Sequence, residues 1–461
     1  MRKTSTYSRP FRRRRPGILL VILAGAAACA APPPTLPASR PLGREIGAAS
    51  PGSPGQPASP FSEPRGKLTL RDALAASLQK SPRLESFAWQ VRADEARALQ
   101  AGLLPNPALV VESENFAGSG GFGGYDAAET TVSLGQLVQL GGKRKKRERI
   151  ALLERELSGW DYEGARLDVL TRTTRRFLAL LAAQERSELA NRLVRLAEQS
   201  LEATRARVRA GAASAVEEAR SNVELSTLRV QLAQRNADLE AARKLLASSW
   251  GTGAPRFEGV AGDLFALRAL PSLSEIEAEL SQNPDLARWA TENARREAAL
   301  DLAKAEAIPD VTAGLGVRRF EESDDSALVF AVEVPIPLFD RNQGGRSAAL
   351  AETHRARALA RARHLELTRA LIATHADASS GLEQATSLRD TVLPQAEAAF
   401  RGTQDGYRRG LFRYVDVLDA QRTLFEARTA YVDALERVHL ASAKLERLIG
   451  APLESLSRGT N

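Results

Sequence analysis

Two aspartates stand three positions apart in the segment YVDVLDAQRTL, residues 414–424. The surrounding residues predict a helix, and residues three apart share a helix face, with about 5–6 Å between their Cβ atoms. We therefore expect the carboxylates of Asp416 and Asp419 to point in the same direction. Such a pair can attract cations, or it can be the solvated flank of an amphipathic helix, where an acid near the N-terminus is favourable.

Other residues that could do chemistry are few. The histidines, at 354, 364, 375 and 439, lack the spacing of metal ligands, and Cys29 is the only cysteine. Because we find no catalytic triad pattern and no phosphate-binding loop, we expect no enzyme activity, no cofactor and no bound metal. We expect the basic run KRKKRER, residues 143–149, to be a solvated strand-to-helix junction near lipid phosphates, not a nucleic-acid site.

The N-terminus has the order of a secretory leader. A basic stretch ending in RRRR is followed by Gly17–Ala28, which is apolar but too short to cross a bilayer as a helix. Residues 1–28 are therefore expected to be a signal peptide. The segment AAAC resembles a bacterial lipobox, so we expect Cys29 to be lipidated. The match departs from the pattern at Ala26, where leucine is preferred. The alternative is cleavage nearby that leaves a free thiol.

Composition places a tether after the leader. Residues 29–66 are rich in Pro, Gly and Ser and are expected to form an extended, lipid-anchored segment. The net charge is +8, but residues 1–28 hold seven Lys or Arg and no acid. The rest of the chain is close to neutral, so the basic balance does not indicate nucleic-acid binding. No later segment has the run of about eighteen apolar residues that a transmembrane helix needs.

The remaining sequence is an internal repeat. Pro82 and Pro107 have the same separation as Pro284 and Pro309, and Gly211 and Gly251 have the same separation as Gly410 and Gly450. We predict a first repeat over 67–251, a linker over 252–270, a second repeat over 271–450 and a C-terminal tail over 451–461.

Each repeat is predicted to contain a helix of about 35 residues ending near a proline, two short strands, and two long helices meeting at a glycine. A heptad seam of apolar residues runs from Val417 to Leu448 and indicates coiled-coil packing. Alternating patterns predict strands at 108–116, 129–138, 311–320 and 327–336. The predicted fold class is mainly α with a small β part: long antiparallel coiled-coil helices plus four strands per chain.

About eight strands are needed to close a membrane barrel, so the sheet is either soluble and partly covered or shared among several chains. The leader and the alternation favour several chains.

Five motifs in combination resemble the TolC-type outer-membrane efflux factor family over about residues 68–450. They are NPAL (106–109), LGGKR (140–144), PIPLFDRNQG (335–344), RAGAASAVEEARS (209–221) and YRRGLFRYVDVLDAQ (407–421). The segment from ESENFAG to LGGKRKKR is similar to the CzcC-like branch, which serves heavy-metal efflux.

The resemblance implies a homotrimer whose twelve strands form one β-barrel in the outer membrane, continued by a helical tunnel into the periplasm. It implies two partners, an inner-membrane resistance-nodulation-division (RND) pump and a periplasmic adaptor (membrane fusion protein). It places Asp416 and Asp419 in a ring of carboxylates at the periplasmic gate, and it matches Tyr407 to a tyrosine that latches the closed tip. The family's latch arginine falls on Phe412.

The expected function is thus the passive exit duct of a tripartite pump for heavy-metal cations, lipid-anchored in the outer membrane and extending into the periplasm. An exit duct for drugs or other small organic molecules is the alternative within the class. A periplasmic lipoprotein adaptor is the alternative from another class, but it would have one helical hairpin flanked by small β-domains. A purely structural coiled-coil lipoprotein would leave the alternating strands unexplained.

Overall fold

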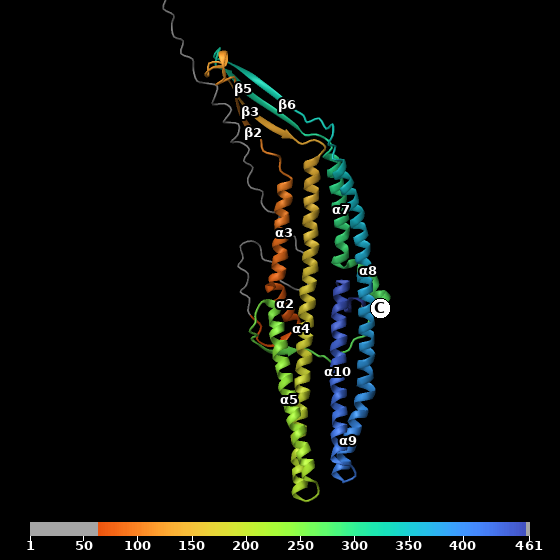
Figure 1. The fold of residues 1–461 in the computed structure, drawn as a ribbon. Helices are drawn as coiled ribbons and strands as arrows, with labels where there is room; N and C mark the ends of the chain where they lie inside the picture. The colour runs from red at the N-terminus through yellow and green to blue at the C-terminus, as the bar shows by residue number, and fades with distance from the viewer. Residues whose placement is uncertain (1–62, 458–461) are drawn as a thin grey trace, which may run out of the picture. The chain divides into compact units, whose positions relative to one another are not determined.

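A computed structural model describes residues 63–457, and the repeat is visible in its order of elements (Figure 1). The first repeat contains β1 (Gly66–Thr69), α2 (Leu70–Lys80), α3 (Pro82–Ala101), β2 (Ala108–Glu114), β3 (Glu129–Val138), α4 (Lys143–Arg209) and α5 (Ala215–Ala247). The second contains β4 (Phe257–Ala261), α6 (Leu273–Ala278), α7 (Pro284–Ala305), β5 (Val311–Phe320), β6 (Asp325–Glu333), α8 (Gln343–Ser387), α9 (Leu393–Arg408) and α10 (Tyr414–Ile449). A final turn, α11 (Glu454–Ser457), follows.

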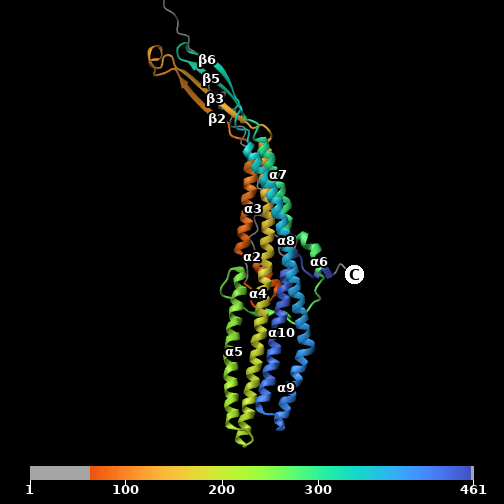
Figure 2. The same ribbon diagram turned by 45° about the vertical axis from the view of Figure 1, so that its right-hand side comes forward.

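The long helices confirm the predicted, mainly helical fold class. Helix α4 has 67 residues and so is about 100 Å long. It pairs with α5, while α9 pairs with α10, and the two turns lie at the same end (Figures 1 and 2). A π-helical turn, Leu388–Val392, separates α8 from α9. None of the described helices combines the length and the hydropathy that a bilayer-crossing helix needs.

The helix predicted before each first strand is wrong as a single element. It is two helices, α2 and α3 in one repeat and α6 and α7 in the other. The break falls before Pro82 and Pro284, because proline lacks an N–H and disfavours helical geometry in the preceding residue. Ser81 and Asn283 cap the new helices, and the Asn283 side chain accepts the N–H of Asp285 at 2.7 Å.

The four predicted strands form one antiparallel sheet in the order β2-β3-β5-β6. Strands β3 and β5 have the predicted bounds, and β3 pairs with β5, so the hairpins of the two repeats join side by side. A second, parallel sheet of β1 and β4 was not predicted. Its strands are too short to show alternation, and β4 lies in the segment predicted as a linker.

The apolar core follows α10, the last long helix of the second repeat. Nine of the ten seam residues predicted from Val417 to Leu448 are buried, and Ala420 is half-buried. Around Leu435, a cluster also takes in Leu180 of α4, Leu246 of α5 and Phe257 of β4. The small parallel sheet is thus packed on the long helices, and the helices hold the turns and the large sheet in place.

Candidate functional site

The two turns between long helices have the same backbone geometry. Gly211 and Gly410 have φ values of +70° and +80°, a conformation that costs glycine little. In each turn the glycine N–H donates to a carbonyl three residues earlier at 3.0 Å, and the next N–H donates to a carbonyl five residues earlier at 2.8 Å. The tips of α4–α5 and α9–α10 are therefore built alike, and their side chains make the difference.

Tyr407 joins the two tips. It is 8% exposed, and its hydroxyl donates to Glu217 Oε2 of α5 at 3.4 Å. The guanidinium of Arg207, from α4, lies 4.2 Å from the centre of the Tyr407 ring, a cation–π distance. Arg207 also donates to the backbone carbonyls of Tyr407, at 3.0 Å, and Ala212, at 3.2 Å. We call Arg207, Glu217 and Tyr407 the tip clasp.

The electrostatics of the clasp favour a neutral phenol. Burial raises the pKa of Tyr407, although the nearby charge of Arg207 acts in the opposite direction. The hydroxyl therefore keeps its proton and donates to the carboxylate of Glu217. Phe412, which stands where the resemblance predicts a latch arginine, packs its ring on Gly406. Sequence reasoning missed Arg207, because two hundred positions separate it from Tyr407.

Asp416 and Asp419 both lie in the first turns of α10, each beside an arginine. Asp416 Oδ2 accepts the backbone N–H of Arg413 at 2.8 Å, so this carboxylate caps the helix. Asp419 is exposed and lies 3.5 Å from the guanidinium of Arg422. The structure thus brings both acids to the tip, and arginines of the same chain partly balance their charge.

The two faces of the four-stranded sheet differ in chemistry. Register pairing aligns Leu109, Leu134, Leu315 and Phe330 in one row across the sheet. All four are more than half exposed. The opposite face is small or polar, with rows such as Val110, Ser133, Gly316 and Val329, and Glu112, Thr131, Arg318 and Ala327. This alternation is typical of a sheet that meets an apolar medium on one face and water on the other.

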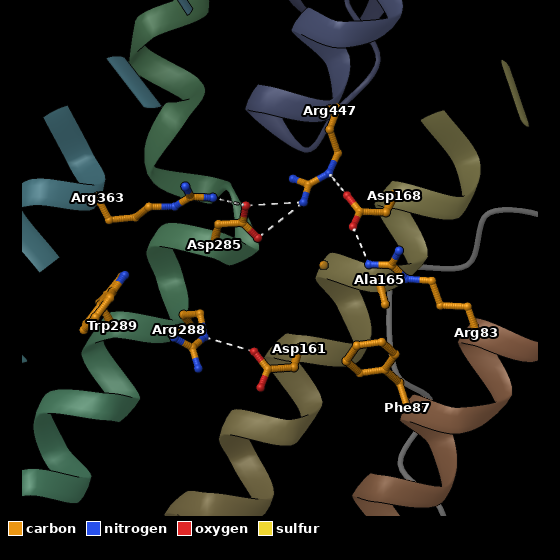
Figure 3. A pocket seen from close by; sticks show the side chains of 11 residues that line it. Arg83, Phe87, Asp161, Ala165, Asp168, Asp285, Arg288, Trp289, Arg363 and Arg447 are labelled. Carbon is orange, nitrogen blue, oxygen red and sulfur yellow. Dashed lines mark hydrogen bonds and ion pairs between the residues drawn. The ribbon is translucent and has the colours of Figure 1, made fainter. Parts of the chain in front are cut away.

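A cavity of about 500 Å³ lies where α3, α4, α7, α8 and α10 meet (Figure 3). Its charged side chains pair across it: Arg447 with Asp168 at 2.8 Å and with Asp285 at 3.3 Å, Arg363 with Asp285 at 2.9 Å, Arg288 with Asp161 at 3.0 Å, and Arg83 with Asp168 at 3.3 Å. We interpret this network as a fastening between helices of the two repeats, because each charge already has a partner.

The basic run at 143–149 begins α4 at the strand-to-helix junction, as predicted, but the expectation that it is solvated is wrong for Lys143. Lys143 is 6% exposed and lies 2.7 Å from Asp310. Arg144 donates to the carbonyl of Gly102 at 2.9 Å, and Arg147 donates to Gln139. These contacts tie the start of α4 to the neighbouring strand and helix ends.

Metal-ligand chemistry has little support in the described residues. No group of three or more His, Cys, Asp or Glu is arranged to hold an ion within residues 63–457. His375 and His439 are instead hydrogen-bonded to the carbonyls of Pro271, at 3.0 Å, and Leu264, at 2.8 Å. The predicted lipidation residue, Cys29, lies outside the described residues.

Comparison with known proteins gives one consistent family. A family model described as outer membrane efflux protein matches residues 73–252 and 276–451. The chain is 34% identical over 388 residues to the cobalt-zinc-cadmium resistance protein CzcC of Cupriavidus metallidurans, covering 84% of this chain and 91% of that relative. It is 26% identical over 421 residues to the pyoverdine export outer membrane protein OpmQ of Pseudomonas aeruginosa, covering 86% and 87%.

Solved structures agree in fold. The outer membrane protein VceC of Vibrio cholerae matches with a TM-score of 0.69 at 18% identity, over 83% of this chain and 96% of that one. The open state of the MtrE outer membrane channel of Neisseria gonorrhoeae also matches with a TM-score of 0.69, at 19% identity, over 83% and 89%.

Proposed function

We propose, on the premise that this chain belongs to the outer membrane efflux protein family, that it is the passive exit duct of a tripartite pump for heavy-metal cations. Membership of this family shows that the chain is an outer-membrane efflux channel that reaches into the periplasm. The family consists of transport proteins. The proposal concerns the cargo, the assembly, the gate and the absence of enzyme activity.

The cargo proposal rests on one observation. The relative that is 34% identical over 84% of this chain is named for resistance to cobalt, zinc and cadmium. Acids at the tip agree with cationic cargo, because carboxylates gathered near one axis attract cations. We assign cargo selection to the pump and adaptor, since the described part of this chain has no metal-ligand group of its own.

The assembly that we propose is a homotrimer, docked at its periplasmic tip by an adaptor (membrane fusion protein) and an RND pump. Uncovered apolar side chains on the long helices support an assembly. On α5, Val216, Val223 and Val230 recur every seven residues and are 61%, 67% and 72% exposed. On α8, Leu365 and Ile372 have the same spacing and are 55% and 47% exposed. Such rows are characteristic of helix faces that a neighbouring helix covers.

The gate that we propose consists of Asp416 and Asp419. The tip clasp of Tyr407, Arg207 and Glu217 would hold them near the three-fold axis of the trimer. Three copies would bring six carboxylates together at the entrance. Cys29 is proposed as the lipidated first residue of the mature protein, which would add a membrane anchor to the sheet.

Planar-bilayer recording of the purified protein tests the duct. We expect a trimer by light scattering and a conductance that prefers cations and is blocked by divalent ions. Replacing both Asp416 and Asp419 by Ala should weaken that block, whereas Glu240→Ala, an exposed acid on α5 away from the tip, should leave it unchanged. A protein without conductance would contradict the duct, and an unaltered block in the double variant would remove these aspartates from the gate.

A second candidate cargo, a small organic molecule, is favoured by the similarity to a pyoverdine exporter over 86% of this chain. Deletion of the gene in its host distinguishes the two. We expect growth to become sensitive to cobalt, zinc or cadmium salts and to be restored by the wild-type gene. Sensitivity confined to organic compounds would support the second candidate.

A further inference from the structure

The four strands of the large sheet carry five acids and two bases, and their distribution between the two faces is uneven. The acids are Glu112, Glu114, Glu129, Asp325 and Glu333, and register places all five on the small, polar face. The bases are the neighbours Arg318 and Arg319, which point to opposite faces because side chains alternate along a strand. Arg318 is therefore the single base on the polar face of these strands.

Arg318, on β5, is held by one acid of β3, the next strand, and by one acid of β2, the strand beyond it. Its Nη1 lies 2.9 Å from Glu129 Oε2, and its Nη2 lies 3.5 Å from Glu114 Oε2. Its Nε donates to the hydroxyl of Thr131 at 2.8 Å. The Arg318 side chain is 29% exposed, so the guanidinium is half-buried between these partners but still borders open space.

The other acids of this face remain open to solvent. The side chains of Glu112, Asp325 and Glu333 are exposed and have no hydrogen bond or ion pair with any of the residues described. They can attract cations to the polar face, while Glu114 and Glu129 are occupied by Arg318. One face thus holds two kinds of carboxylate, free and neutralised.

We propose that Arg318 sets the cation preference of the duct, by neutralising Glu114 and Glu129 and so keeping them from retaining the cations that pass. This inference rests on the proposed function, in which the polar face borders the water-filled path. A conducting path must attract an ion yet let it leave, and a ring of free carboxylates holds divalent ions longest. Arg318 leaves Glu112, Asp325 and Glu333 to attract cations, and it neutralises Glu114 and Glu129, which lie directly opposite each other on β2 and β3.

Neighbouring Arg319 supplies a matched control. It lies on the apolar face and pairs with Glu321 at 3.0 Å and with Asp324, both in the turn after β5. Loss of Arg319 also removes one positive charge from the chain, one position away, but not from the polar face. A general effect of net charge would act on both variants alike, whereas the proposed effect acts on Arg318 alone.

Reversal potentials of single channels in a salt gradient test the proposal, with wild type, Arg318→Met, Arg318→Lys and Arg319→Met compared. We expect the ratio of K⁺ to Cl⁻ permeability to rise about twofold or more in Arg318→Met. Block by Zn²⁺ should occur at roughly tenfold lower concentration. Arg318→Lys, which keeps the charge, and Arg319→Met should resemble wild type.

A variant that retains Arg318 covers the case in which Arg318→Met does not fold. Combining Glu114→Gln with Glu129→Gln leaves Arg318 unpaired and should shift the permeability ratio toward Cl⁻. Equal ratios in wild type, Arg318→Met and this double variant, measured in channels that conduct, would overturn the proposal. A wild-type protein that does not conduct would contradict the proposed duct instead, so the two failures are distinguishable.

Discussion

The helical tip of the first repeat and that of the second are equivalent in backbone and different in burial. The turns at Gly211 and Gly410 share their positive φ and their hydrogen bonds. Yet α10 buries sixteen of its 36 residues in this chain, whereas α5 buries five of 33. The first repeat therefore presents an open flank at α5, and the second supplies the core.

The same comparison separates what the repeat keeps from what it varies. Equivalent positions of the two tips are separated like Gly211 and Gly410, so Arg207 corresponds to Gly406 and Tyr407 to Val208. The clasp thus takes its two charged residues, Arg207 and Glu217, from the first repeat and its aromatic ring from the second.

The largest expected effect is a difference in stability between equivalent positions of α10 and α5. Leu435 is fully buried, and its counterpart in α5 is Asn236, which is exposed. Leu435→Ala should lower the free energy of unfolding by about 3 kcal/mol, through lost burial and the cavity left behind. Asn236→Ala should cost less than about 1 kcal/mol, because its hydrogen bond with Ser187 is exposed. Denaturant unfolding in detergent measures both, and similar costs would contradict the asymmetry.

Loss of the clasp should open the tip, and its two halves should differ in effect. Arg207→Met removes the cation–π contact and two hydrogen bonds to carbonyls, whereas Tyr407→Phe removes one hydrogen bond of 3.4 Å. We expect the open probability in planar bilayers to rise several-fold in Arg207→Met and less in Tyr407→Phe. Arg192→Met, which breaks an exposed pair within α4, is the control. A larger effect of Tyr407→Phe would show that the hydroxyl, not the guanidinium, holds the tip.

A half-buried acid distinguishes the ends of the two equivalent helices. Glu446, near the end of α10, corresponds to the fully buried Ala247 of α5. Burial raises the pKa of Glu446 above its ordinary value of 4.5, although the N–H of Leu453 and the charge of Arg268 act in the opposite direction. The folded state therefore prefers the neutral acid, and wild type loses stability as pH rises above 4.5.

Glu446→Gln should accordingly raise the unfolding temperature at pH 7 to 8, and the difference from wild type should close as the pH is lowered to 4.5 and below. Circular-dichroism melts across that range measure it. A difference that stays constant with pH would show that the amide acts through packing and not through charge.

The sequence predictions were accurate where a strict periodic pattern extends over many residues. The bounds of β3 and β5 follow from alternation over ten residues, and the heptad positions of α10 from steps of three and four. β1 and β4, of four and five residues, are too short for any period to show, and their pairing joins residues almost two hundred positions apart. The clasp was only half predictable: a motif marked Tyr407, but no local pattern connects it with Arg207.

The smallest effects separate the two aspartates of the tip from each other. Asp416 accepts the N–H of Arg413 at the start of α10, so Asp416→Ala should lower the free energy of unfolding by about 1 kcal/mol. Asp419 is exposed and makes only a long pair with Arg422, so Asp419→Ala should change stability by less than about 0.3 kcal/mol. If Asp419→Ala weakens block by divalent cations without altering denaturant unfolding, its carboxylate serves the cargo and not the fold. If it destabilises the protein as much as Asp416→Ala does, Asp419 is also part of the helix start.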